Sequence, residues 1–308
     1  MLKIIFMGTP KFSVPILQAL DEKYDVIAVV TQPDRPVGRK RIMTPSPVKE
    51  YAVSHNIPVY QPEHIKEEYD NLINLNSDLI VTAAYGQFVG MKLLNSPKYR
   101  AINCHGSLLP KYRGGSPIQT AIKNGEKETG ISIMYMEQKM DAGDILSVKK
   151  VPIDIYDTAD SLFDKMSLAA RDLLMETIPL LIENKINPIK QNEEEATFAY
   201  NITREEELLD FSKSTIEVYN HIRAFYSSPL TYFIFNNEEI KVSKAKLIDN
   251  TQPFNINKKI DNLVIFNKNH LAVLCGDNTY LELLELKPWG KSFQKASDFI
   301  NGYLAKTK

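Results

Sequence analysis

The side chains best suited to chemistry follow one apolar run in the first half of this 308-residue chain. Residues 101–105 read Ala-Ile-Asn-Cys-His, which predicts a buried strand, and a loop rich in glycine and proline follows it to Gly115. Because residues two apart on a strand share a face, Asn103 and His105 should project side by side, with Cys104 turned away. A carboxamide beside an imidazole can stabilise an oxyanion and move protons, as acyl transfer requires. The alternative is a turn after a core strand, in which His105 is merely hydrogen-bonded.

A mostly parallel sheet with helices on both faces is the architecture that the first half predicts. Short apolar runs typical of buried strands alternate there with stretches typical of helices. The expected strands cover 3–7, 26–31, 78–84, 101–105, 130–137 and 145–151, and the expected helices cover 13–20, 47–55, 64–75, 117–123 and 157–182. Gly8 follows the first strand without the two further glycines of a dinucleotide-binding loop. The fold class is therefore α/β and Rossmann-like, without an NAD site.

Ligands of such sheets bind beyond the carboxyl ends of the strands. The segments that carry distinctive residues all follow a predicted strand, and they are 8–12, 32–41, 83–86, 103–115 and 137–144. Because these strand ends should meet at one edge of the sheet, we expect the segments to form a single site there.

The second half predicts a small β-barrel after a linker. Residues 187–204 are polar and acidic and lack a clear apolar stripe, so we assign 1–186 to one domain, 187–204 to a linker and 205–308 to a second domain. The second domain should contain a helix at 216–225 and short strands at 230–235, 239–242, 263–266, 270–274 and 279–286. Trp289 is expected to anchor the packing of this barrel rather than to stack on a base.

Charge is balanced overall but unevenly distributed. The chain has 37 basic and 38 acidic residues, a net charge of −1, which argues against a general nucleic-acid binder. The segment from Gln32 to Lys49 is nevertheless basic and rich in proline, and further lysines gather towards the C-terminus. A basic loop and a basic C-terminal region on a neutral protein fit one specific polyanion, although any single charge cluster can simply be a solvated face.

Cysteine usage and hydropathy indicate the cellular compartment of the protein. Cys104 and Cys275 lie in apolar runs without paired spacing, so neither a metal site nor a disulfide framework is expected. The N-terminal apolar run is too short for a signal peptide, and no run has the length of a membrane span. We expect a cytoplasmic monomer with no membrane association.

The segment Asn-x-His-x-Ser-Leu-Leu-Pro-x-x-Arg-Gly at 103–114 resembles the signature of the folate-dependent formyltransferases. Further segments that resemble the family are 6–12, 31–39, 45–49 and 83–86. The first half of the chain matches densely and the last third only loosely. The resemblance implies formyl transfer from 10-formyltetrahydrofolate to the free amino group of initiator methionyl-tRNA, and an OB-like C-terminal barrel.

The resemblance also implies which residues act. It makes Asp141 the third catalytic residue beside Asn103 and His105. On sequence alone a turn residue ahead of Gly143 is the favoured interpretation of Asp141, and Asp144 competes for the catalytic role. The segments expected near the folate comprise Ala83, Ala84, Tyr85, Gly86, Ser107, Leu108, Leu109 and Pro110, while the basic loop expected at the tRNA acceptor stem offers Arg35, Arg39, Lys40 and Arg41. Ser107 is expected to hold its loop rather than to act as a nucleophile.

Each residue type suits a step of formyl transfer. The carboxamide of Asn103 can donate to the oxyanion, His105 can act as a second donor when protonated or as a base when neutral, and Asp141 can orient the imidazole. Rival hypotheses are N-formylation of a nucleotide-linked amino sugar, formylation of phosphoribosylglycinamide, hydrolysis of the formyl-folate, and a non-catalytic RNA-binding protein on the same fold. The basic loop distinguishes the leading hypothesis, because a small acceptor would not need it.

Overall fold

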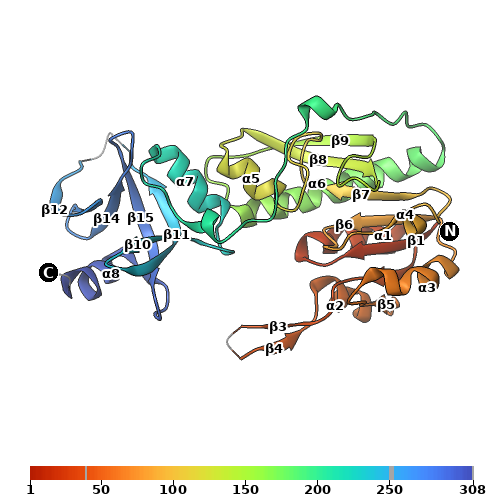
Figure 1. Cartoon of the computed structure of the whole chain (residues 1–308), viewed down its shortest axis with the longest axis horizontal. Helices are drawn as coiled ribbons and strands as arrows, with labels where there is room; N and C mark the ends of the chain where they lie inside the picture. Colours follow the sequence, from red (N-terminus) through yellow and green to blue (C-terminus); the bar gives the residue numbers. More distant parts are fainter. Residues whose placement is uncertain (39, 250–252, 307–308) are drawn as a thin grey trace. The chain divides into compact units, whose positions relative to one another are not determined.

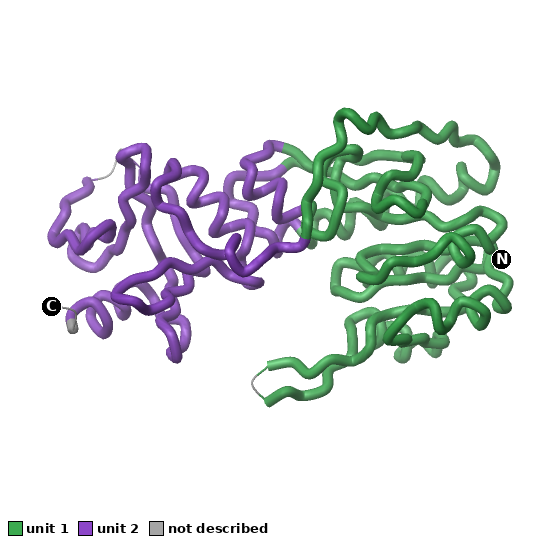
Figure 2. Tube along the Cα trace, viewed as in Figure 1, with its two compact units in different colours: residues 1–117, 128–152, 163–200 green, residues 118–127, 153–162, 201–308 purple. Residues whose placement is uncertain are grey.

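The computed structural model describes residues 1–38, 40–249 and 253–306. Contacts divide these described residues into two compact units (Figure 2). Unit 1 comprises 1–117, 128–152 and 163–200, and unit 2 comprises the described residues of 118–127, 153–162 and 201–308. The domain boundaries expected from sequence, at 186 and 204, stay a prediction.

Unit 1 is built on one mostly parallel sheet (Figure 1). Its strands run in the order β5-β2-β1-β6-β7-β8-β9. They are β1 Lys3–Gly8, β2 Asp25–Val30, β5 Val59–Tyr60, β6 Leu79–Ala83, β7 Ala101–His105, β8 Glu128–Tyr135 and β9 Ile145–Pro152. Pairing is parallel from β5 to β7, whereas β8 and β9 run antiparallel to their neighbours. The Rossmann-like architecture is thus confirmed.

Side chains on both faces of the central strands of this sheet are buried. Ile5 and Met7 belong to an apolar cluster with residues of α3 and α4, whereas Ile4 and Phe6, equally buried, point to the opposite face. The helices of the chain are α1 Val14–Lys23, α2 Pro47–Ser54, α3 Tyr69–Asn74, α4 Met91–Leu94, α5 Pro117–Lys123, α6 Ala159–Ile182, α7 Thr215–Ala224 and α8 Ala296–Gly302. No helix within the described residues is both long and apolar enough to cross a membrane.

The basic segment after β2 forms a hairpin rather than the loop expected from sequence. Strands β3, Arg35–Val37, and β4, Ile42–Thr44, pair antiparallel and project as a two-stranded ribbon (Figure 1). Every described side chain from Arg35 to Thr44 is exposed, including the apolar Val37, Ile42 and Met43. No apolar side chain of either strand is buried, so these residues lack the alternation of buried and exposed positions that predicts a strand.

Unit 2 is built on an antiparallel sheet, in the order β10-β11-β15-β14-β13-β12. Its strands are β10 Thr231–Phe235, β11 Glu238–Leu247, β12 Ile256–Ile260, β13 Leu263–Phe266, β14 His270–Leu274, β15 Tyr280–Pro288 and β16 Gln294–Lys295. Helices α7 and α8 pack Val218, Ile222 and Phe299 into the core of this sheet. The C-terminal antiparallel domain is confirmed. The pairing among described residues follows an open path, so closure into an OB-like barrel stays a prediction.

Phe299 provides a test of this core. Its side chain is fully buried, so Phe299→Ala should lower the free energy of unfolding of unit 2 by about 3–5 kcal/mol. Amide hydrogen exchange in β14 and β15 measures the change. The matched control is Phe293→Ala in the same unit, where the ring is 39% exposed and the loss should stay below about 1 kcal/mol. Equal losses in the two variants would contradict the assigned core.

Candidate active site

Strand β7 presents the two candidate side chains at its carboxyl end. Asn103 is half-buried and His105 is 5% exposed, and both follow from the alternation expected on a strand. Cys104, between them, is buried, and burial raises the pKa of its thiol to about 12. A thiol with such a pKa stays protonated near neutrality, so Cys104 is a packing residue rather than a nucleophile.

The amide of Asn103 is held by the neighbouring parallel strand. Thr82 in β6 lies in register with Asn103, and its hydroxyl donates to Asn103 Oδ1 at 2.8 Å. Since Oδ1 accepts from Thr82, the carboxamide nitrogen is the branch turned away from that hydroxyl. In the described part of the chain no protein acceptor faces that nitrogen, which leaves both of its N–H groups for a ligand. This is the arrangement that an oxyanion donor needs.

His105 contacts one acceptor through each ring nitrogen. Nε2 lies 2.9 Å from the carbonyl oxygen of Tyr112, and because a carbonyl can only accept, Nε2 carries a hydrogen. Nδ1 lies 3.6 Å from Asp141 Oδ2. A second proton on Nδ1 would complete an ion pair with that carboxylate. The structure thus brings the third predicted residue beside the imidazole.

Asp141 reaches His105 by a route that the sequence did not predict. We expected segment 137–144 at the same edge as the other strand ends. Because β8 is antiparallel to β7, it ends beside the start of β7, where the Met136 N–H donates to the carbonyl of Ala101 at 2.9 Å. The segment therefore begins at the other edge of the sheet from the one expected, although Asp141 itself lies at the expected edge, beside His105. Its loop returns along β7 to place Asp141 at the far end of that strand.

The Asp141 loop has tight backbone requirements. Asp141 has φ +50°, in the left-handed region, and its Oδ2 accepts a hydrogen bond of 2.8 Å from the Gly114 N–H. A Cβ at Gly143 would lie 1.9 Å from the carbonyl oxygen of Tyr135, so only glycine fits there. Gln191 Nε2 donates to the carbonyl oxygens of Asp141 and Gly143, at 2.9 and 2.7 Å.

The buried guanidinium of Arg113 holds the Gln191 side chain that bonds to the Asp141 loop. The side chain of Arg113 is fully buried and donates through Nε and Nη2 to Gln191 Oε1, at 3.1 and 2.8 Å. It also donates to both carboxylate oxygens of Glu193, at 2.8 and 3.2 Å. The guanidinium, with Lys139, lowers the pKa of the Glu193 carboxyl to about 2, so the pair is charged near neutrality.

Gln191 and Glu193 were missed because they lie in the predicted linker. Part of that segment belongs to unit 1, where Ile189 forms an isolated β-bridge with Ile145 and Phe198 forms one with Arg113. The backbone of Arg113 accepts from Ala199 N at 2.7 Å and donates to Thr197 O at 2.9 Å. We refer to residues 189–199 as the strap. Its polar, acidic sequence contains no periodic signal, and only the motif residue Arg113 could have pointed to an anionic partner.

The segment 83–86 alternates between buried and exposed residues. Ala83 and Tyr85 are buried, and the Tyr85 side chain belongs to the apolar core of unit 1. Ala84 and Gly86 are exposed, with φ of +48° and +91°. A ligand above this segment would therefore meet its backbone. Phe88, 60% exposed, lies two residues on and was not singled out from sequence.

The segment 107–110 is largely a supporting element. Ser107 is fully buried and donates to the Lys111 carbonyl at 2.6 Å, which confirms its expected role in holding the loop. Leu109 is buried with Met134 and Ile145. Leu108 is half-buried and Pro110 likewise, so these two retain some exposed surface.

The predicted tRNA-contacting residues lie on the β3–β4 hairpin. Arg35 donates to Glu63 at 2.9 Å, and both side chains are about three-fifths exposed. Lys40 and Arg41 are exposed at the turn, and Arg39 lies outside the described residues. In unit 2, Trp289 is 73% exposed. The expectation that Trp289 anchors core packing was therefore wrong, because it follows β15 in a turn and not in the sheet.

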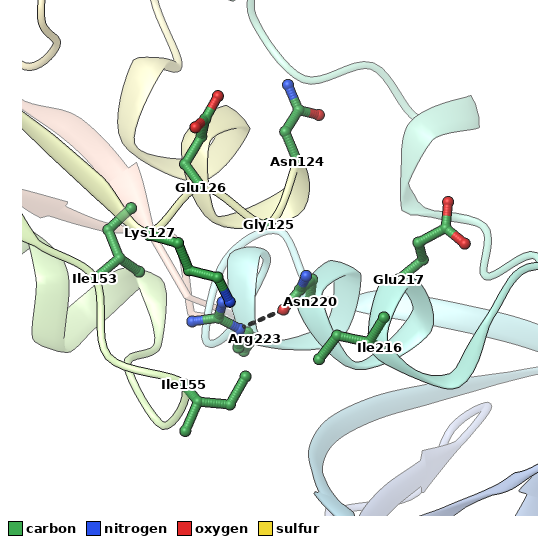
Figure 3. A pocket seen from close by; sticks show the side chains of 10 residues that line it. All are labelled: Asn124, Gly125, Glu126, Lys127, Ile153, Ile155, Ile216, Glu217, Asn220 and Arg223. Carbon is green, nitrogen blue, oxygen red and sulfur yellow. Dashed lines mark hydrogen bonds between the residues drawn. The ribbon is translucent and has the colours of Figure 1, made fainter.

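A cavity of about 310 Å³ lies in unit 2 (Figure 3). It is lined by Asn124, Gly125, Glu126, Lys127, Ile153, Ile155, Ile216, Glu217, Asn220 and Arg223. Arg223 is buried and donates through Nε to Asn220 Oδ1 at 2.9 Å, and through Nη1 to the carbonyls of Asp154 and Asp157 at 3.1 and 2.8 Å. These bonds give Arg223 a structural role in holding the turn before α6. The cavity contains none of the predicted site residues.

No group of three or more His, Cys, Asp or Glu side chains within the described ranges is placed to hold a metal ion.

Comparisons with known proteins give matches over most of the chain. A family model described as formyl transferase matches residues 2–178, and the C-terminal domain model of formyl transferase matches 201–304. The methionyl-tRNA formyltransferases of Bacillus thuringiensis subsp. konkukian and of Bacillus anthracis are each 49% identical to this chain over 305 residues, which cover 98% of this chain and 96% of theirs.

Solved structures share the fold at lower identity. WlaRD, a sugar 3N-formyl transferase crystallised with dTDP and 5-N-formyl-THF, superposes with a TM-score of 0.69 at 22% identity, covering 95% of this chain and 99% of that one. HypX from Aquifex aeolicus, in complex with tetrahydrofolic acid, gives a TM-score of 0.66 at 13% identity, covering 99% of this chain and 47% of HypX. At these identities the likeness shows the fold.

Thr82 offers a test of how the Asn103 amide is held. Thr82→Val keeps the shape of the side chain but removes the donor to Asn103 Oδ1. We expect kcat for formyl transfer to fall about tenfold, less than the 10²–10³ typical of deleting an oxyanion donor outright. The matched control is Thr129→Val in β8, because Thr129 is equally buried and its hydroxyl has no partner in the described structure. Wild-type kcat in Thr82→Val would refute the positioning role.

Proposed function

The chain belongs to the formyl transferase family, and we propose that Asn103, His105 and Asp141 carry out its transfer of a formyl group to methionyl-tRNA. It moves the formyl group of 10-formyltetrahydrofolate to the free amino group of initiator methionyl-tRNA. Identity of 49% over nearly the whole of both chains supports this activity. The observation that carries the residue assignment is the 3.6 Å approach of Asp141 to a His105 ring lying beside the free amide of Asn103.

Each residue has one step in the mechanism. As the amino nitrogen attacks the formyl carbon, negative charge develops on the formyl oxygen, and Asn103 Nδ2–H donates to it. Since Nε2 of His105 donates to the Tyr112 carbonyl, Nδ1 is the ring nitrogen that takes up the proton released by the attacking amine and supplies it to the departing folate nitrogen. The Asp141 carboxylate, 3.6 Å from Nδ1, stabilises the ring while it is charged. Asp141 keeps the ring in the orientation that both transfers need. No covalent enzyme intermediate is required.

The folate is proposed to bind where β6 and β7 end. These strands are hydrogen-bonded neighbours, so segments 83–86 and 107–110 leave the sheet beside one another. The exposed backbone at Ala84 and Gly86 offers amide and carbonyl groups that can read the edge of a flat pterin, and the half-buried Leu108 and Pro110 offer apolar surface. The residues present therefore fit the co-substrate, which supplies the formyl group.

Contact with tRNA is proposed for two surfaces, one on each unit. On unit 1 the β3–β4 hairpin combines Arg35, Lys40 and Arg41 with exposed apolar side chains. On unit 2, Lys241 of β11 lies directly opposite Lys287 of β15, although Lys241 is also 3.9 Å from Glu239. Like charges opposite one another destabilise a sheet, and an anion such as a phosphate would relieve that repulsion.

A cytoplasmic, monomeric enzyme is part of the proposal, as expected from the sequence. The monomeric state is tested by light scattering after size exclusion, where a dimeric mass would overturn it.

The activity is tested with separate acceptors: methionyl-initiator tRNA, methionyl-elongator tRNA and a nucleotide-linked amino sugar. We expect the enzyme to transfer the formyl group of 10-formyltetrahydrofolate to the initiator tRNA and not to the sugar. His105→Ala should lower kcat by about 10²–10⁴ with little change in folate binding, because it removes proton transfer and not a binding surface. Formylation of the sugar alone would refute the substrate assignment. A near-wild-type rate in His105→Ala would refute the role of the imidazole.

The hairpin is tested by the salt dependence of tRNA binding. The triple variant Arg35→Ala, Lys40→Ala, Arg41→Ala should weaken tRNA binding and reduce the slope of log K against log[salt] by about 0.7–0.9 for each phosphate that is no longer neutralised. A triple variant of exposed lysines elsewhere on unit 1, Lys23→Ala with Lys66→Ala and Lys92→Ala, is the control for removal of the same number of charges. Equal slopes in the two variants would mean that the hairpin is only a solvated surface.

A further inference from the structure

Gln191 links the strap to the catalytic loop through a saturated set of hydrogen bonds. Its side chain is 5% exposed. The amide nitrogen donates both hydrogens, one to the carbonyl of Asp141 and one to the carbonyl of Gly143. The amide oxygen accepts twice from Arg113. Since a carboxamide has two N–H donors and an oxygen that accepts twice, every hydrogen-bonding group of Gln191 is used.

The partners of Gln191 are the residues that contact the catalytic side chains. Arg113 stands between Tyr112, whose carbonyl accepts from His105, and Gly114, whose N–H donates to the Asp141 carboxylate. Gln191 joins this tripeptide to the backbone of Asp141 itself. The imidazole and the carboxylate are therefore fixed to two loops, and Gln191 is a side-chain bridge between those loops.

The backbone of Asp141 requires such a bridge. A non-glycine residue in the left-handed region costs about 1–3 kcal/mol, and it persists only when its surroundings hold it. The carboxylate alone is anchored by one N–H, from Gly114. The bonds to the carbonyls of Asp141 and Gly143 restrict the peptide groups that follow these two residues, and the first of these groups is attached directly to the Cα that carries the carboxylate.

We propose that Gln191 is a positioning residue for formyl transfer, which acts by holding the Asp141 carboxylate against His105. The inference rests on the proposed function, since it assumes that the imidazole and Asp141 act together in the reaction. Gln191 does not reach His105 or the end of Asn103 through any bond of its own, so its effect on the reaction passes through Asp141.

Two variants separate the donors from the acceptor of Gln191. Gln191→Met has a similar volume and removes all four bonds. Gln191→Glu retains an acceptor for Arg113 and gives up both donors to the Asp141 loop. Misplacement of a reacting group by about 1 Å can cost about 10² in rate, so we expect kcat to fall about tenfold to a hundredfold in both variants. KM for tRNA and for the folate should change less than about threefold, because neither binding surface is touched.

A double-mutant cycle with Asp141 decides whether Gln191 acts through that residue. In an Asp141→Asn background, Gln191→Glu should lower kcat by less than about threefold, because groups that act as a unit are not additive. A purely structural role would give the same loss of kcat in both backgrounds, and that outcome would overturn the inference. Gln191→Glu keeps a partner for the buried Arg113, so it serves if Gln191→Met fails to fold.

The matched control is Asn192→Ala. Asn192 is the next residue of the strap, is exposed and bonds only within the strap, to Glu194 and Glu195, so kcat should match that of the wild type. Wild-type kcat in Gln191→Glu overturns the positioning role and leaves the proposed function intact. Absence of formyl transfer in the wild-type enzyme is the separate result that would overturn the proposed function.

Discussion

The organisation of the candidate active site depends on one buried charge. A guanidinium without water is costly unless every part of it is paired, and removal of one partner from such a pair typically costs about 3–5 kcal/mol. Arg113 is fully buried, and its partners are a side-chain amide and a carboxylate, both from the strap. The folded state can therefore satisfy Arg113 only with the strap in place. That requirement fixes the loop at 112–114, whose backbone contacts both His105 and Asp141.

The antiparallel direction of β8 makes this fixed loop necessary. Were β8 parallel, Asp141 would follow a strand that ends beside His105, and the sheet would position it. Instead the loop after β8 begins at the start of β7 and must run the length of that strand. A loop has no ladder of hydrogen bonds to define its course, so side chains must supply them. Gly143 allows the loop to approach the carbonyl of Tyr135 closely. Gln191 supplies hydrogen bonds from its side chain to the backbone of the loop.

Local sequence predicted the elements whose residues decide their own structure. Strand β7 and helix α5 were predicted at their observed bounds, and the alternation of β7 placed Asn103 and His105 on one face, because apolar runs and flanking turn residues act over short range. The helix expected at 64–75 is divided into a 3-10 turn, Ile65–Glu68, and α3, a choice that tertiary packing makes. The direction of β8 and the β3–β4 pairing carry no local signal at all.

The candidate site also combines residues that local sequence predicted with residues that only the folded structure revealed. Alternation predicted the Asn103–His105 pair from physics, whereas the catalytic role of Asp141 came from resemblance, since a turn of this composition is common. The one helix and one strand between His105 and Asp141 showed only that the Asp141 loop can return to the end of β7. Gln191 could not be found by either route. It is one amide in a polar segment, and what makes it distinctive is that four bonding groups from two distant loops converge on it. Convergence of that kind is a property of the folded chain. It follows that the residues performing chemistry can be sought in sequence, while those that set the geometry of the chemistry must be sought among buried, fully bonded polar side chains.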